Sequence, residues 1–143
     1  MHYYFRSNLN SKIGLGHFSR IQYLINLFKG KNCTVILDKL SNKLLKNYNK
    51  IRIEELYNKN SKFINEIDDA KKIKKFLKHK SNSIVIVDDY RLSFKWEKYL
   101  SNSCKKIVCI DDFINRKHYS DYYLNTKPDF FSITKKKYEN YKS

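Results

Sequence analysis

Residues 83–90, SIVIVDDY, and residues 106–112, KIVCIDD, decide the fold. In each, a polar first residue is followed by four consecutive apolar, mostly β-branched residues and then by two aspartates. A continuous apolar run, without alternation of apolar and polar residues, is typical of a strand buried on both faces of a parallel sheet. Parallel neighbours need crossover connections, most often helices. The two stretches therefore predict an α/β protein.

The rest of the chain supplies alternating strands and helices. We expect strands at residues 3–6, 33–37, 51–53, 83–87, 106–110 and 121–124, and helices at residues 18–29, 40–48, 66–78 and 94–100. The first helix has apolar residues at spacings of three and four, from Phe18 to Phe28, and Gly30 as its C-cap. This order predicts a doubly wound, Rossmann-like, mainly parallel sheet. We expect one domain over residues 1–133 and a charged tail over 134–143 that begins a linker.

Length and composition narrow the class of protein. The chain has 143 residues, 41% of them hydrophobic, and no apolar run approaches the roughly 20 residues of a membrane-spanning helix. The amino-terminal residues lack the pattern of a signal peptide. These features predict a cytoplasmic protein without a membrane span.

The formal net charge of +16 has three possible explanations. Only five of the 30 basic residues are arginine, and Ala70 is the only alanine, a bias that an adenine- and thymine-rich coding sequence produces by itself. Solvated lysine-rich faces explain the charge best, and attraction of a phosphate-bearing ligand comes second. Nucleic-acid binding is the least favoured, because no arginine-rich reading helix is recognisable.

The cysteines Cys33, Cys104 and Cys109 are odd in number, form no C-x-x-C pair and have no histidine at ligand spacing. We therefore expect no disulfide framework, no metal site and no cofactor. The side chains of His2, His79 and His118 are expected at the surface.

A glycine-containing loop precedes the first helix. Gly14 and Gly16 stand between the first strand and that helix, but Ser19 occupies the place of the third glycine in a dinucleotide fingerprint, and no Walker lysine follows. The carboxyl ends of parallel strands share one edge, where such sheets bind ligands. The glycine loop, residues 88–90 and residues 111–112 are expected to meet there.

His17 is the candidate base at this edge. A helix start disfavours a protonated imidazole, so a neutral ring there can accept a proton from water; the alternative is a histidine bonded to a neighbouring carbonyl. Asp88 and Asp111 either cap the following helices or hold substrate groups. Arg20 either points at a ligand or pairs with an aspartate, and Tyr90 can reach the crevice.

Three ordered blocks carry a family resemblance. They are residues 6–8 with 13–20 (RSN and IGLGHFSR), residues 87–90 (VDDY) followed by Trp96-Glu97, and residues 110–112 (IDD) leading through Arg116, His118 and Asp121 to residues 124–125 (LN). In these blocks the chain resembles the nucleotide-sugar hydrolases of pseudaminic acid biosynthesis and the related spore-coat polysaccharide biosynthesis proteins.

The resemblance implies the amino-terminal half of a glycosyltransferase-B-like fold. Its implied activity is release of UDP from UDP-2,4-diacetamido-2,4,6-trideoxy-β-L-altropyranose, without a metal, with His17 activating water for inverting attack on the anomeric carbon. The implied partner is a second, UDP-binding half. The expected substrate-binding residues are Arg6, Ser7, Asn8, Gly14, Gly16, Arg20, Asp88, Tyr90 and Asp111.

Two departures from the family pattern shape the expected function. Asn8 replaces the usual aspartate, and the chain ends at Ser143, about where the second domain begins in the family. We therefore expect little turnover by this chain alone. The alternative is a non-catalytic module of a surface-glycan pathway that binds a sugar or a protein.

Overall fold

The structure is a computed structural model and describes residues 1–8, 15–28, 32–39, 51–59, 61–77, 80–113 and 115–126. In these ranges the strands are β1 (His2–Ser7), β2 (Asn32–Leu37), β3 (Arg52–Glu55), β4 (Ser83–Asp88), β5 (Lys106–Ile110) and β6 (Tyr122–Leu124). The helices are α1 (Leu15–Leu27), α2 (Glu66–Lys74) and α3 (Phe94–Leu100), with a 3-10 turn, η1, at Lys80–Asn82.

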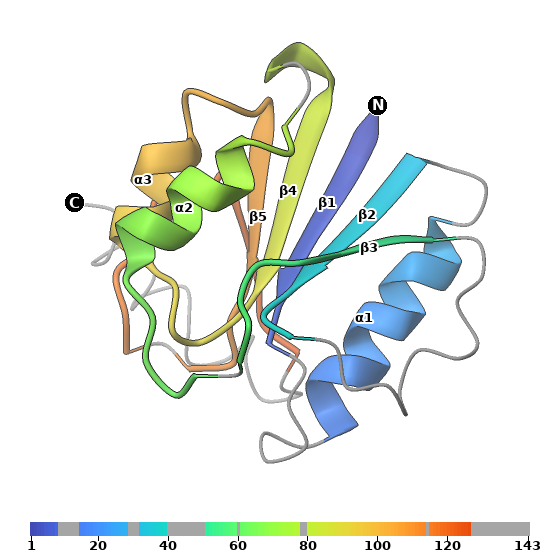
Figure 1. The fold of residues 1–143 in the computed structure, drawn as a ribbon, viewed down its shortest axis with the longest axis horizontal. Coiled ribbons are helices and arrows are strands. Elements are labelled where there is room, and N and C mark those ends of the chain that lie inside the picture. The colour runs from blue at the N-terminus through green and yellow to red at the C-terminus, as the bar shows by residue number, and fades with distance from the viewer. Residues whose placement is uncertain are drawn as a thin grey trace.

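The strands form one sheet in the order β3-β2-β1-β4-β5-β6, and every pairing between neighbours is parallel (Figure 1). This is the doubly wound Rossmann-like order, so the predicted fold class is confirmed. The order reverses at β1, which pairs with β2 on one side and with β4 on the other. Sheets of this kind bind ligands in the crevice beyond the carboxyl ends of the strands at that reversal.

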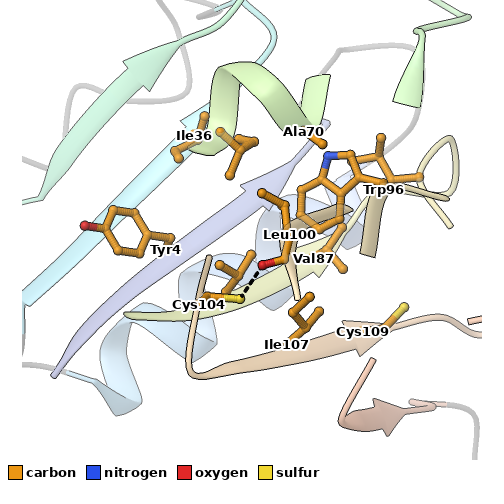
Figure 2. Close-up of a cluster of buried hydrophobic side chains, with 12 residues drawn as sticks. Tyr4, Ile36, Ala70, Val87, Trp96, Leu100, Cys104, Ile107 and Cys109 are labelled. Carbon is orange, nitrogen blue, oxygen red and sulfur yellow. Dashed lines mark hydrogen bonds between the residues drawn. The ribbon is translucent and has the colours of Figure 1, made fainter. Parts of the chain in front are cut away.

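Helices cover both faces of the sheet. α2 and α3 pack on one face, where Trp96 and Leu100 are completely buried among apolar residues (Figure 2). α1 packs on the other, where Ile21 and Ile25 contact the opposite side chains of the strands. Burial on both faces explains why the central strands are apolar without alternation.

Successive strand residues contribute to opposite faces. On β1, Tyr4 lies in the cluster under α2 and α3, whereas Phe5 lies in the cluster under α1. On β4, Val87 faces α2 and α3 while Ile86 faces α1. This alternation also determines which polar side chains come together at the carboxyl ends of the strands.

Several predicted boundaries agree closely with the structure. The predictions for α3 and β5 are confirmed residue for residue. α2 starts where predicted, because the Asn65 side chain accepts hydrogen bonds from the N–H groups of Ile67 and Asp68. It ends at Lys74 rather than residue 78, since the following residues form tighter bonds to the third preceding carbonyl, as from Phe76 N–H to Ile73 O.

Some expectations fall on residues outside the described ranges. These are the helix at 40–48, the C-cap Gly30, Gly14 of the loop, His79 and the tail at 134–143. Among the described helices, none combines the length and the apolar character that crossing a membrane requires.

Candidate functional site

The candidate base His17 and the candidate substrate-binding residue Asp88 meet at the carboxyl ends of β1 and β4. α1 begins at Leu15, which places His17 in its first turn. Asp88 is the last residue of β4, and its Oδ1 lies 2.9 Å from Nδ1 of His17. Both side chains are buried, with 9% of the His17 side chain exposed. Asp88 therefore binds the imidazole rather than capping the helix that follows it.

This contact fixes which nitrogen of His17 carries a proton. A carboxylate oxygen can only accept, so Nδ1 is the donor toward Asp88. Nη2 of Arg20 lies 3.2 Å from the same Nδ1, but a protonated nitrogen cannot accept, so that contact is proximity rather than a second hydrogen bond. In the neutral ring, Nε2 is left with a free lone pair, as a general base needs.

Arg20 links the last residue of β4 to Asp112, two residues beyond the end of β5. Its guanidinium binds both oxygens of Asp88, at 3.2 Å through Nε and 3.1 Å through Nη2, and binds Asp112 at 2.5 Å through Nη1. Burial by itself lowers the pKa of Arg20, but the hydrogen bond with Tyr90 and the charges of Asp88 and Asp112 outweigh it and raise that pKa. Two roles were predicted for Arg20, contact with a ligand or pairing with an aspartate, and the structure shows the pairing.

Asp112 is a member of the site that the sequence analysis did not select. Its Oδ1 accepts hydrogen bonds from the N–H and hydroxyl of Thr126, at 2.9 and 2.7 Å. These bonds and Arg20 lower the pKa of Asp112 to about 2, although burial acts in the opposite direction. The carboxylate thus stays charged and links α1 to the residue two positions beyond β6.

Tyr90 completes the site. Its ring lies edge-on to the His17 ring, with centroids 4.8 Å apart. Its hydroxyl lies 3.2 Å from Oδ2 of Asp112 and 3.3 Å from Nη2 of Arg20. Burial raises the pKa of Tyr90, so the hydroxyl remains protonated and can donate to Asp112. We call His17, Arg20, Asp88, Tyr90 and Asp112 the edge cluster.

Strand alternation explains why Asp112, and not Asp111, joins the edge cluster. Asp88 follows Ile86 by two residues, and Asp112 follows Ile110 by two residues; both isoleucines face α1. Asp111 follows Cys109 by two residues, and Cys109 faces α2 and α3. Extending the period of two past the strand ends would have found Asp112 from the sequence.

Asp111 therefore belongs to a different set of contacts. It is completely buried, binds Arg116 through Nε at 2.9 Å and His118 through Nε2 at 3.1 Å, and accepts a hydrogen bond from Phe113 N–H at 2.7 Å. The prediction that Asp111 binds substrate is not supported, because its oxygens are engaged within the protein.

His118 is not the surface residue that the sequence analysis expected. Only 7% of its side chain is exposed, and its ring lies between Asp111 and Glu97. Its Nδ1 is also 3.4 Å from the sulfur of Cys109, nine residues away in sequence. The spacing of cysteines and histidines along the sequence did not reveal this contact, because it forms only when the chain returns toward β6.

The structure also does not support the prediction that Arg6 binds substrate. Its side chain is fully buried and binds Asp69 at 2.7 Å and Asp38 at 2.6 Å. Arg91 binds Asp38 at 2.7 Å and Asp89 at 2.6 Å from the more exposed side. These five residues form what we call the closed ion cluster. The guanidinium of Arg6 thus joins β1 to α2 instead of facing a ligand.

Ser7, Asn8 and Gly16 remain at the edge of the site. Ser7 Oγ donates to the Asp88 carbonyl at 3.2 Å and so holds β1 against β4. Asn8 is 3% exposed, yet among the described residues neither the oxygen nor the nitrogen of its side-chain amide has a hydrogen-bond partner. A Cβ added at Gly16 would meet no atom of the described residues within 4 Å.

Comparison with known proteins adds no assignment: no family model, no curated protein and no solved structure matches this chain. The fold and the edge cluster define a Rossmann-like α/β protein with a candidate acid–base site at the reversal of strand order.

Proposed function

We propose that this chain is the amino-terminal domain of a nucleotide-sugar hydrolase in which His17 is the general base. The observation that carries the proposal is the 2.9 Å contact between His17 Nδ1 and Asp88 at the β1/β4 edge. It leaves Nε2 as the basic nitrogen on a residue that contacts the carboxyl end of β4, the part of the sheet where this fold binds ligands. The substrate follows from the family resemblance: UDP-2,4-diacetamido-2,4,6-trideoxy-β-L-altropyranose.

The proposed reaction is a single displacement. Nε2 of His17 takes a proton from water as the water oxygen attacks the anomeric carbon. The bond from that carbon to the UDP oxygen breaks, and UDP leaves with the electron pair, so the configuration inverts. The Asp88 carboxylate orients the imidazole and stabilises the imidazolium that forms, as the acid of a catalytic triad does.

Other members of the edge cluster support this base. Arg20 offsets one of the two negative charges of Asp88 and Asp112. It also holds Asp88 together with His17, so that Asp88 has two partners rather than one. Tyr90 packs its ring against the imidazole and limits its rotation. The amide of Asn8, which has no partner within the described part of the chain, offers one acceptor and two donors to a polar sugar substituent. A second α/β domain is assigned most of the UDP contacts, as the resemblance implies.

A non-catalytic sugar-binding module is the second candidate. It is favoured by the small exposure of the His17 side chain, 9%, and by the hydrogen bonds that occupy the polar atoms around it. In this case the edge cluster would orient a sugar without activating water.

The deciding experiment measures UDP release and substrate binding together. The chain is mixed with a candidate UDP-binding domain and the UDP-diacetamido-trideoxy-hexose, and wild type is compared with His17→Asn. We expect His17→Asn to lose turnover by a factor of about 10² or more while retaining binding. His2→Asn is the matched control, because His2 lies at the amino end of β1, where its ring contacts Thr34. Wild-type turnover by His17→Asn would refute the role of His17, and binding without turnover by the wild type would favour the second candidate.

A further inference from the structure

A second cluster of chemically reactive side chains lies on the other face of the sheet. Glu97 comes from α3, Cys109 from β5, and His118 from the segment between β5 and β6. Oε1 of Glu97 is 2.7 Å from Nδ1 of His118, and Sγ of Cys109 is 3.4 Å from the same nitrogen. One ligand atom from each residue lies within 4.8 Å of the other two. The cluster thus brings an oxygen, a sulfur and a nitrogen toward one point.

Each side chain is held in place by a further contact. The other ring nitrogen of His118 is 3.1 Å from Asp111, and the second oxygen of Glu97 accepts a hydrogen bond from the N–H of Tyr119. Cys109 is fixed by the parallel pairing of β5 with β4. A carboxylate on the far nitrogen of a histidine is the usual outer contact of a metal-binding imidazole, because it fixes the tautomer and the ring orientation.

We propose that Glu97, Cys109 and His118 form a binding site for a zinc ion. Thiolate, imidazole and carboxylate are the three ligand types that zinc takes in proteins, and three protein ligands leave one tetrahedral position for a solvent molecule. Calcium and magnesium prefer oxygen ligands alone, so the sulfur and nitrogen argue against them.

The site is separate from the proposed hydrolase chemistry. Cys109 faces α2 and α3, whereas the edge cluster is built with α1. Zinc here would tie α3, β5 and the segment before β6 together. Failure of the zinc proposal leaves the role of His17 untouched, and the reverse also holds.

Cobalt titration of the full chain tests the proposal. Metal-stripped protein is titrated with Co²⁺ and then with Zn²⁺, and zinc stoichiometry is measured by competition with a chromophoric chelator. We expect one equivalent of metal, a thiolate-to-cobalt charge-transfer band, the visible bands of tetrahedral cobalt, and loss of both on adding zinc. Absence of the charge-transfer band in the wild type, or of zinc uptake, would overturn the site.

Two cysteine variants locate the metal. Cys109→Ser is expected to lose the charge-transfer band, while Cys104→Ser keeps it. Cys104 is a matched control, since it is equally buried on the same face but its sulfur contacts the Leu100 carbonyl at 3.4 Å, apart from Cys109 (Figure 2). Circular dichroism confirms that each variant is folded. Should Cys109→Ser fail to fold, Glu97→Gln replaces it, with an expected loss of affinity of at least tenfold; an unchanged cobalt spectrum and affinity in the folded variant contradicts the assignment.

Discussion

The edge cluster and the closed ion cluster share two consecutive residues at the end of β4, yet they are suited to different tasks. Asp88 and Asp89 are adjacent in sequence, but Asp88 binds His17 and Arg20 whereas Asp89 binds Arg91. In the edge cluster Arg20 keeps 21% of its side chain exposed and a titratable imidazole is present. In the closed ion cluster Arg6 is completely buried.

The difference separates a structural role from the proposed catalytic role among polar residues at the carboxyl ends of the strands. Alternation along each strand sends consecutive polar residues to opposite faces of the sheet. On the α2 side they meet a buried charged network in which guanidinium groups satisfy carboxylates. On the α1 side they meet a helix start that carries His17. The predictions below separate the two roles.

The largest expected effect on stability is that of Arg6→Met. It leaves Asp38 and Asp69 without their fully buried partner, and breaking such an ion pair costs about 3–5 kcal/mol of folding free energy. Urea unfolding followed by circular dichroism measures this loss. Arg52→Met is the control, because the Arg52–Glu54 pair is largely exposed and contributes at most about 1 kcal/mol. Equal losses in the two variants would contradict the structural role of Arg6.

Replacing the neighbouring aspartates tests the division of roles directly. Asp88→Asn is expected to reduce turnover by about 10²-fold or more in the proposed hydrolase assay with a UDP-binding domain, since the amide cannot hold the same His17 tautomer and charge. Asp89→Asn is expected to lower the stability and leave turnover per folded molecule within a fewfold of wild type, because it contacts Arg91 and not His17. Comparable turnover in the two variants would show that the edge cluster has no special role.

A smaller effect on stability is expected at acidic pH, where the Asp112 carboxylate gains a proton. The pKa of Asp112 is about 2 in the folded protein, against an ordinary value of 3.8. A lowered pKa stabilises the fold above the ordinary value, and this contribution is lost as the pH falls from 3.8 toward 2. Asp112→Asn should therefore flatten the stability profile in that window. An identical decline in wild type and variant would contradict the described contacts of Asp112.

The smallest effect on stability is expected at Gly16. Since a Cβ would meet nothing within 4 Å, Gly16→Ala should leave thermal stability unchanged or raise it by at most about 1 kcal/mol. If this position faces the ligand, the same variant weakens binding of the nucleotide sugar in a calorimetric titration. A marked loss of stability would show that the space is already filled by the protein.

Much of the fold could be predicted because the apolar runs of β4 and β5 are unambiguous. α3 and β5 were located residue for residue, and the meeting of residues 17, 88 and 90 at one edge followed from the parallel sheet. The pairing of Arg20 with two aspartates was one of two readings that the sequence allowed.

Other parts of the site could not be read from local sequence. Arg6 and Asp69 are 63 residues apart, so their ion pair depends on how α2 packs. The environment of His118 depends on the return of the chain to β6, which no local pattern specifies. Asp112 is the exception, because the alternation of β5 already placed it on the α1 side.

The most direct test of the central claim is the tautomer of His17, measured by long-range ¹H–¹⁵N NMR of the imidazole in the neutral state. The claim is that Asp88 holds the proton on Nδ1 and leaves Nε2 as the base. We expect an Nδ1-protonated ring in the wild type and a shift toward the Nε2-protonated form in Asp88→Asn. A wild-type ring protonated on Nε2 would contradict the assignment of His17 as the base.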